Sequence, residues 1–264
     1  MIPLTEDRKM LGYELLASYP GISCFVTTRH GGCSQGNYAS LNCTPYTGDE
    51  AEAVRRNQEI VCSSLPQRPQ ELVIPFQTHG TKALVIDGTY LHATAEERHS
   101  MLQGIDALIT REPGCCICIS TADCIPILLY DRKNAVIAAV HAGWRGTVQK
   151  MTQTAVKRMT TEFGVNANEI KAVIGPAICL DCFQVGKDVY DGLYGSVTDH
   201  TEGFRERYGE YYAGLKDINR QQLIEAGVEQ IDVCPYCTAC GEKLFFSYRH
   251  ENKTGYRHSA VLKL

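Results

Sequence analysis

Long hydrophobic runs and long basic stretches are both absent from this chain of 264 residues. No apolar run approaches the roughly 20 residues that a membrane-spanning helix requires, so we expect no membrane partner. The formal net charge is −4, and without a basic stretch a nucleic acid is not expected as the main partner. Residues 1–11 lack the apolar core of a secretory signal. We therefore expect a cytoplasmic protein.

Internal repeats, low-complexity segments and a convincing linker are absent as well. Hydrophobic residues make up 44% of the chain and charged residues 21%, which is ordinary for a globular protein with a sizeable core. We therefore interpret residues 1–264 as a single domain. The composition indicates nothing about assembly beyond a monomer or a weak homo-oligomer.

Cysteine, by contrast, is plentiful, with 13 residues. An odd number in a chain without a secretory signal argues against a disulfide framework. Several of these residues, such as Cys116 and Cys118, lie in apolar runs, where cysteine behaves as a small hydrophobic residue.

Hydrophobic patterning predicts clusters of strands separated by helices. Apolar, β-branched segments bounded by turn residues predict strands at 22–28, 72–76, 83–86, 106–110, 115–121, 125–130, 135–141, 171–175, 229–233, 244–247 and 260–264. Amphipathic spacing predicts helices at 50–63, 146–163, 186–194 and 216–226. Residues 88–103 are interpreted as a loop or short helix, and residues 195–208 as a polar stretch. This alternation indicates a mixed α/β protein.

Three short segments give the best indication of function: QTHG at 77–80, TADCIP at 121–126 and HAGWRGT at 141–147. They place His79, Cys124 and His141 at the ends of predicted strands, where functional groups tend to gather. Two imidazoles and one thiolate can hold Zn²⁺ and leave a fourth position open, which is the pattern of a catalytic zinc. The three residues are 45 and 17 positions apart, so no local spacing rule links them. A histidine or cysteine of this kind, taken alone, is more often a structural residue than a ligand.

The third segment also opens the predicted helix at 146–163. A glycine-containing turn at a helix N-terminus, with Arg145 as a bidentate donor, predicts an anion site. The alternative is that the glycines only shape the turn and Arg145 is solvated. Trp144, the single tryptophan, either stacks on a base or packs in the core. Arg249, after a predicted strand, is a second anion donor or a plain surface arginine.

Two C-x-x-C spacings raise the question of a second metal. They lie in CLDC (Cys179, Cys182) and in CPYCTAC (Cys234, Cys237, Cys240). Such pairs can build a structural zinc site with four cysteines. Cys182 and Cys234 are 52 positions apart, which is more than a compact zinc ribbon uses. The sequence leaves open a second metal site, a reactive cysteine pair or neither.

The order of the motifs resembles a known family. They are TRHGG (28–32), SLN (40–42), QTHG (77–80), GIDAL (104–108), TADCIP (121–126), HAGWRG (141–146), GPAI (175–178), CT (237–238) and FFSYR (245–249). The chain, over about residues 20–264, resembles the YfiH-type family. This family was long labelled polyphenol oxidase or multicopper laccase domain, and is now described as purine nucleoside phosphorylases with adenosine deaminase activity. The departures are Thr78, where the family often has valine, and the extra cysteines Cys179, Cys182, Cys234 and Cys240.

The resemblance implies a fold and a site. The fold class is α/β (α+β mixed), a four-layer αββα sandwich with mixed sheets, as one catalytic domain over residues 1–264. The zinc ligands and catalytic residues are His79, Cys124 and His141. The implied reactions are phosphorolysis of adenosine, inosine and 5′-methylthioadenosine to base plus (methylthio)ribose 1-phosphate, and hydrolytic deamination of adenosine. The candidate ligands of nucleoside and phosphate are Arg29, Asn42, Arg145 and Arg249.

Other functions use the same residues. A His₂Cys set also suits copper, so a copper-dependent polyphenol oxidase is one alternative. The chain has only 8 histidines, none in an H-x-H pair, and no methionine near Cys124, which argues against a multicopper oxidase. A metal-free cysteine hydrolase is another alternative, with Cys124 as nucleophile and His141 or His79 as base. The family resemblance connects the cysteine hydrolase with amide hydrolysis in cell-wall precursor editing. The last alternative is a purine-binding module without turnover.

Overall fold

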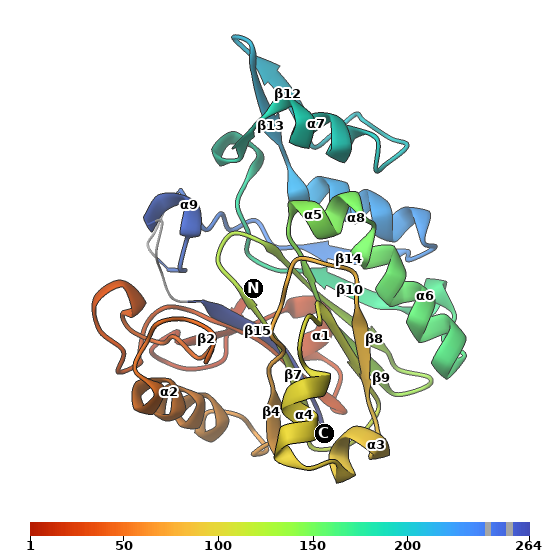
Figure 1. Ribbon diagram of the computed structural model, residues 1–264. Helices are drawn as coiled ribbons and strands as arrows, with labels where there is room; N and C mark the ends of the chain where they lie inside the picture. The colour runs from red at the N-terminus through yellow and green to blue at the C-terminus, as the bar shows by residue number, and fades with distance from the viewer. Residues whose placement is uncertain (241–243, 252–255) are drawn as a thin grey trace.

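The protein is built on two mixed six-stranded sheets, seen in a computed structural model that describes residues 1–240, 244–251 and 256–264 (Figure 1). In spatial order, the first sheet contains β1 (Ile2–Pro3), β2 (Met10–Gly12), β3 (Ile22–Thr27), β15 (Arg257–Lys263), β7 (Cys115–Thr121) and β4 (Glu71–Val73). The second contains β14 (Gln230–Val233), β10 (Lys171–Ile174), β8 (Ile125–Asp131), β9 (Val136–Ala142), β6 (Ala107–Thr110) and β5 (Ala83–Ile86).

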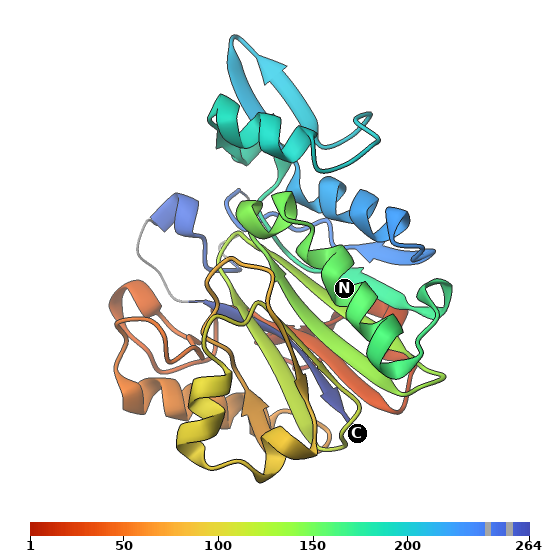
Figure 2. The same ribbon diagram turned by 45° about the vertical axis from the view of Figure 1, so that its right-hand side comes forward.

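The helices of the described chain are α1 (Glu14–Ala17), α2 (Ala51–Ser63), α3 (Gly88–His92), α4 (Ala95–Met101), α5 (Trp144–Val148), α6 (Met151–Phe163), α7 (Lys187–Tyr194), α8 (Leu215–Glu225) and α9 (Tyr248–Glu251). The outer face of the first sheet is covered by α2, and the outer face of the second sheet is covered by α6 and α8. A small third sheet of β11 (Gln184–Val185), β13 (Glu210–Ala213) and β12 (Phe204–Arg207) projects from the body together with α7 (Figure 2). None of the helices in the described part of the chain is long and apolar enough to cross a membrane.

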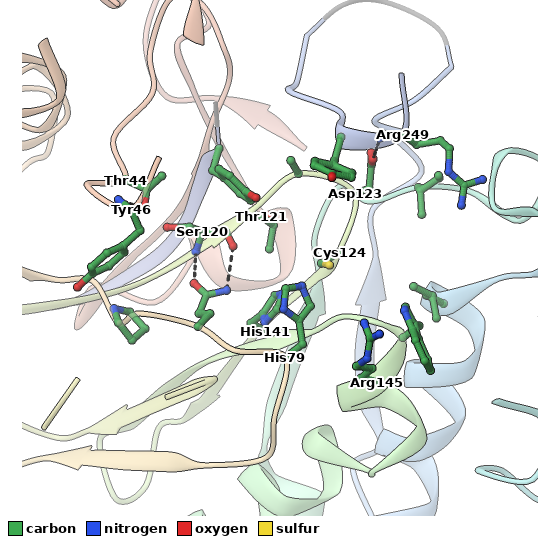
Figure 3. A pocket seen from close by; sticks show the side chains of 18 of the residues that line it. Thr44, Tyr46, His79, Ser120, Thr121, Asp123, Cys124, His141, Arg145 and Arg249 are labelled. Atoms are coloured by element: carbon green, nitrogen blue, oxygen red, sulfur yellow. Dashed lines mark hydrogen bonds between the residues drawn. The ribbon is translucent and has the colours of Figure 1, made fainter. Parts of the chain in front are cut away.

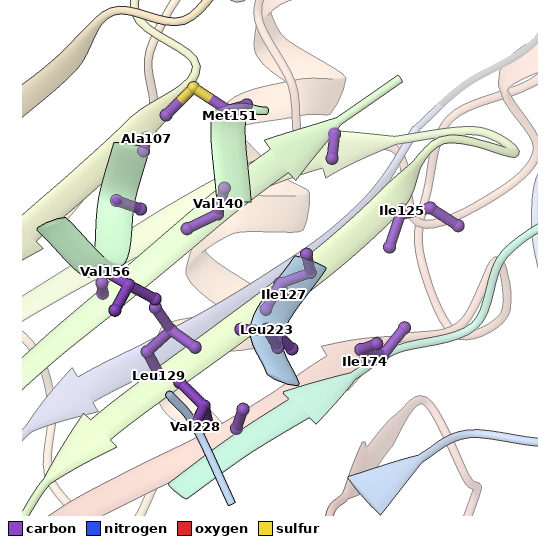
Figure 4. Packing of buried hydrophobic residues seen from close by; sticks show 14 of the residues in the cluster. Ala107, Ile125, Ile127, Leu129, Val140, Met151, Val156, Ile174, Leu223 and Val228 are labelled. Carbon is purple, nitrogen blue, oxygen red and sulfur yellow. The ribbon is translucent and has the colours of Figure 1, made fainter. Parts of the chain in front are cut away.

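Three hydrophobic cores separate four layers. The side chains of Val26, Ile117 and Ile137 belong to the core between the two sheets. A second core lies between the second sheet and helices α6 and α8 (Figure 4). A third lies on the outer face of the first sheet, where Val61 of α2 contributes. The order helix, sheet, sheet, helix confirms the predicted four-layer αββα sandwich with mixed sheets.

Most strands that the sequence predicts are present with small shifts at their ends. The strands at 83–86 and 115–121 have the predicted bounds, and the helix at 50–63 is α2, which buries Val54, Asn57 and Val61. β7, β8 and β9 are buried at every position, which explains their uninterrupted apolar sequences.

Two expectations about local structure were wrong, and a segment without a predicted element contains a strand. The helix predicted at 146–163 is broken into α5 and α6, because Lys150 has a left-handed backbone with φ 60°. The polar stretch at 195–208, for which the sequence predicted no helix or strand, contains β12, which pairs with β13 in a hairpin. Residues 244–247 form no strand, and Arg249 lies in the short helix α9. The anion site predicted at the start of a long helix therefore has only the single turn of α5 behind it.

Candidate metal centre

The candidate ligands meet because the strand ends beside them lie next to one another at one end of the second sheet. β8 runs antiparallel to β9, with Pro126 opposite His141, so the start of β8 and the end of β9 coincide. β6 runs antiparallel to β9, and β5 runs parallel to β6. The loops before β5, β6 and β8 and the loop after β9 therefore emerge together. The loops before β5, β6 and β8 carry His79, Asp106 and Cys124, and His141 lies near the end of β9 itself.

His79, Cys124 and His141 converge as the motifs predict. Their ligand atoms all lie within 4.8 Å of one another, and the two imidazole rings meet edge to face with centroids 4.8 Å apart. His141 is buried, Cys124 is partly buried and His79 is exposed (Figure 3). This donor set and spacing fit a divalent metal held by three protein ligands, with access from the exposed side.

Asp106 orients this group and was not identified as a functional residue from the sequence. Its carboxylate is fully buried and accepts a hydrogen bond from Nδ1 of His141 at 2.8 Å. It also accepts the backbone N–H groups of His79 at 3.0 Å and Gly80 at 2.7 Å. A carboxylate behind a ligand histidine directs its other nitrogen toward the metal. The signal that was available is an aspartate directly before an apolar strand, in the GIDAL segment.

Charges within the cluster favour the thiolate of Cys124. Burial raises the pKa of the Cys124 thiol, but His141 and His79 together lower it to about 6. Burial lowers the pKa of His141, whereas Cys124 and Asp106 raise it to about 9. The pKa of Asp106 lies below its usual value, because contacts with His141 and backbone N–H groups outweigh its burial. The thiolate is the form that binds metals and attacks electrophiles.

Two loops of the site have unusual backbones. His79 has φ 61° and Asp123, next to Cys124, has φ 83°. Both conformations are uncommon for non-glycine residues and are stabilised by local contacts. Asp106 anchors the first loop, and the Asp123 carboxylate accepts hydrogen bonds from Oγ1 of Thr238 at 2.5 Å and from the backbone N–H of Arg249 at 2.6 Å.

Gly143 leaves the space that the ligand side chains occupy. A Cβ atom at this position would lie 2.7 Å from Cδ2 of His79 and 3.0 Å from Sγ of Cys124. Both distances are shorter than normal van der Waals contacts, so any side chain at residue 143 displaces a ligand.

We expect Gly143→Ala to weaken metal binding by roughly 10- to 100-fold, the range seen when the support of a metal ligand is disturbed. The measurement is the metal dissociation constant by competition with a chelator. Gly21→Ala is a matched control, since its Cβ would meet only Oη of Tyr130, at 3.7 Å. Equal metal affinity in both variants would show that the space beside Gly143 is not needed to hold the metal ligands.

A pocket of about 580 Å³ opens over the three ligands. Its walls are rich in aromatic side chains: Tyr46, Phe76, Trp144, Phe183, Tyr248 and Tyr256. Arg145 and Arg249 lie on one side of Cys124, whereas Thr44 and Tyr46 lie on the other (Figure 3). The Arg145 guanidinium stacks over Trp144 at 4.2 Å from the ring centroid. A pocket of this size holds a small organic molecule.

Arg29 and Asn42 do not line this pocket. The Arg29 guanidinium donates to the carboxylate of Glu251 at 2.5 Å and to the carbonyl oxygen of Ala39 at 3.1 Å. Asn42 is fully buried, and its side-chain oxygen accepts the backbone N–H of Tyr256 at 3.1 Å. Asn42 thus supports a pocket residue, and direct contact of Arg29 or Asn42 with a substrate stays a prediction.

Comparison with known proteins identifies the family. Residues 23–263 match the family model described as multi-copper polyphenol oxidoreductase laccase. A purine nucleoside phosphorylase of Bacteroides thetaiotaomicron is 51% identical over 253 residues, which cover 94% of each chain. The chain belongs to the YfiH/YlmD family. An adenosine deaminase, RL5, from an unknown prokaryotic organism is 34% identical and matches 89% of this chain and 91% of that protein.

A solved YfiH/YlmD structure has the same architecture. YlmD from Geobacillus stearothermophilus superimposes with a TM-score of 0.89 at 31% identity, covering 98% of this chain and 97% of that one. The family model carries the name of a copper enzyme, whereas the similar proteins are named for purine nucleosides. The family is thus metal-associated by name, and the name of the model does not identify the metal.

Proposed function

We propose that this protein is a zinc-dependent purine nucleoside enzyme. It cleaves adenosine, inosine and 5′-methylthioadenosine with phosphate to the base and (methylthio)ribose 1-phosphate, and it deaminates adenosine with water. The observation that carries the proposal is the convergence of His79, Cys124 and His141 under an aromatic pocket. The similar proteins named purine nucleoside phosphorylase and adenosine deaminase support the substrate class.

The residues of the chain divide into three roles in this proposal. His79, Cys124 and His141 hold the zinc ion, which when bound supplies a Lewis acid suited to activating water. The pocket walls are rich in aromatic side chains, such as Tyr46 and Phe76, whose ring centroids are 5.1 Å apart. These rings offer faces on which a purine can stack. Arg145 forms the phosphate side of the pocket, because a guanidinium group binds phosphate through two parallel hydrogen bonds. The Arg249 guanidinium donates to the carbonyl oxygens of Cys182 and Gln184, so its contact with phosphate stays a prediction.

The test is to incubate metal-replete protein with adenosine, with and without phosphate, and to separate the products. We expect adenine and ribose 1-phosphate only with phosphate, and inosine under both conditions. Inosine and 5′-methylthioadenosine are then compared under the same conditions. Absence of both adenine and inosine from metal-replete protein would refute the proposal.

Arg145→Ala separates the two reactions. A hydrogen bond to a charged group contributes about 1.5–3 kcal/mol. We therefore expect a KM for phosphate about 10- to 100-fold higher, with deamination of adenosine largely retained. Arg220→Ala is the control, because Arg220 is a partly exposed arginine that pairs with Glu202 and lies outside the pocket lining. An unchanged KM for phosphate in Arg145→Ala would remove this residue from the phosphate site.

A cysteine hydrolase is the second candidate, and one observation favours it. Cys124, His141 and Asp106 lie in the order nucleophile, base and orienting carboxylate. A triad of this kind does not need His79. The ligand atom of His79 nevertheless lies within 4.8 Å of those of Cys124 and His141, as a metal site requires. Full activity on an amide substrate after chelation would favour this candidate, whereas loss of nucleoside turnover on chelation favours the metal enzyme.

Copper chemistry is less well supported by the arrangement of ligands. Among the described residues, two groups bring three or more ligand side chains together, and only the group of His79, Cys124 and His141 contains histidine. A trinuclear copper centre needs many further histidines. Blue colour on copper loading together with phenol turnover would revive this reading.

A further inference from the structure

Four cysteines outside the pocket lining also meet at the edge of the second sheet. They are Cys179, Cys182, Cys237 and Cys240, and their Sγ atoms all lie within 4.8 Å of one another. β10 and β14 are parallel neighbours, with Ile174 opposite Val233, so the chain leaves both strands at the same edge. A bridge between Ala177 and Cys237 extends this pairing. The sheet thereby brings together two C-x-x-C segments that are far apart in sequence.

The separation of the sulfur atoms matches a single tetrahedral metal ion. Ligands about 2.3 Å from zinc define a tetrahedron with edges of about 3.8 Å. The Sγ atoms of Cys179 and Cys240 are 3.8 Å apart. This distance is far longer than the bond of about 2.05 Å in a disulfide. An iron–sulfur cluster would place its cysteines on different iron atoms and spread the sulfur atoms further apart.

The backbone around Cys237 is arranged for a negatively charged sulfur atom. Its Sγ accepts N–H groups from Cys179 at 3.3 Å, Ala239 at 3.4 Å and Cys240 at 3.4 Å. Hydrogen bonds of this kind hold metal-binding thiolates in place. Three N–H groups directed at one sulfur atom, from both segments, show that the two turns are fitted to each other.

Two positive side chains contact the backbone of the two cysteine segments. The Lys216 ammonium donates to the carbonyl oxygen of Cys234 at 2.9 Å and to that of Tyr236 at 3.3 Å. The Arg249 guanidinium donates to the carbonyl oxygen of Cys182 at 3.2 Å. Four thiolates around Zn²⁺ carry a net charge of −2, and a lysine and an arginine held at these segments are favourable neighbours for it.

We propose that Cys179, Cys182, Cys237 and Cys240 bind a second zinc ion, which is structural and fastens one wall of the substrate pocket. Four protein ligands close the coordination sphere, so this ion takes no part in chemistry. Cys234, which forms the other C-x-x-C spacing with Cys237, is not a ligand: it is buried and its Sγ donates to Sδ of Met1.

The second ion would act on the pocket through its neighbours in sequence. Ile178 and Phe183, which flank the first cysteine pair, line the pocket. Thr238, within the second pair, donates to the carboxylate of Asp123, the residue before Cys124. Loss of the ion is therefore expected to loosen substrate binding more than to remove the reaction.

The test is elemental analysis of the full chain purified with zinc. We expect two zinc ions per chain in the wild type and one in Cys240→Ser and in Cys179→Ser/Cys240→Ser. One zinc ion is likewise expected in Cys124→Ala. Cys33→Ser is the control, because Cys33 is exposed and belongs to neither group, and it should retain two. We also expect the double variant to unfold about 5 to 10 °C below the wild type and to raise KM for adenosine more than it lowers kcat.

A cobalt measurement first reports on the site while all four cysteines are intact. Cobalt loaded into Cys124→Ala is expected to show intense sulfur-to-cobalt absorption, because these four cysteines are the one other group of three or more metal-ligating side chains among the described residues. Adding Cys179→Ser and Cys240→Ser should abolish that band. Unchanged zinc content in both serine variants, bound iron in place of zinc, or a disulfide among these cysteines in unreduced protein would each overturn the proposal. Because Cys124→Ala removes the other site, failure here is distinguishable from failure of the proposed function.

Discussion

Cys124→Ala is expected to lose the zinc ion of the pocket and to lower turnover of adenosine by about 1000-fold or more. The substitution removes the one thiolate among the three ligands and leaves two imidazoles, of which only His141 is held by a carboxylate in the described part of the chain. A metal ion supplies several kcal/mol of transition-state stabilisation. Four kcal/mol corresponds to about a 1000-fold change in rate.

The measurement combines zinc content with the rates of phosphorolysis and deamination. Cys33→Ala serves as the control for removal of a thiol, since Cys33 is exposed and outside both metal groups. If Cys124→Ala keeps the pocket zinc and most of its activity, Cys124 is not a ligand. If the rates fall while the zinc content of metal-replete protein stays unchanged, the cysteine hydrolase reading gains support.

Asp106→Asn is expected to weaken zinc binding by about 10- to 100-fold, as is typical for a group that orients a metal ligand. All the contacts of this carboxylate are to donors: Nδ1 of His141 and the backbone N–H groups of Thr78, His79 and Gly80. An amide presents N–H to at least one of these donors, which leaves an unsatisfied group in a buried site. The loop that carries His79 is therefore expected to shift.

The effect of Asp106→Asn is measured as the zinc dissociation constant and as activity over a range of zinc concentrations. Asp131→Asn is a matched control, because Asp131 is also a buried carboxylate that accepts backbone N–H groups, from Lys133 and Asn134, in a turn outside the pocket lining. A positioning role predicts that excess zinc restores activity in Asp106→Asn. If both variants lose the same stability and neither loses zinc affinity, Asp106 is only structural.

The sequence predicted secondary structure well for strands that are buried along their whole length. β7, β8 and β9 are buried at every position, and their continuous apolar runs predicted them closely. The sequence predicted secondary structure poorly where the backbone of one residue ends a helix, or where a strand is exposed. Lys150 interrupts the predicted long helix with a left-handed backbone, although the apolar stripe continues on both sides. The hairpin of β12 and β13 is mostly exposed along β12, so its polar sequence carried no strand signal.

In the candidate site, too, the sequence predicted some functional residues and missed another. The residue types alone identified His79, Cys124 and His141 as a plausible ligand set, because soft and borderline donors next to turn residues are informative by their chemistry. The importance of Asp106 was hidden, since a lone aspartate before a strand has no distinctive pattern. Only its burial beneath His141 and the loop of residues 78–80 shows what it does.

By itself, the sequence determined the mixed α/β class, the buried strands and the kinds of side chain available for a metal. The tertiary structure decided which of them meet. Strand order places the start of β5, β6 and β8 and the end of β9 at one edge, which gathers the pocket ligands. The parallel pair of β10 and β14 brings Cys179 and Cys182 to Cys237 and Cys240 at the same edge and leaves Cys234 aside. The physical reason is that hydrophobic patterning records which residues are buried, whereas the pairing of distant strands depends on contacts between segments far apart in the chain.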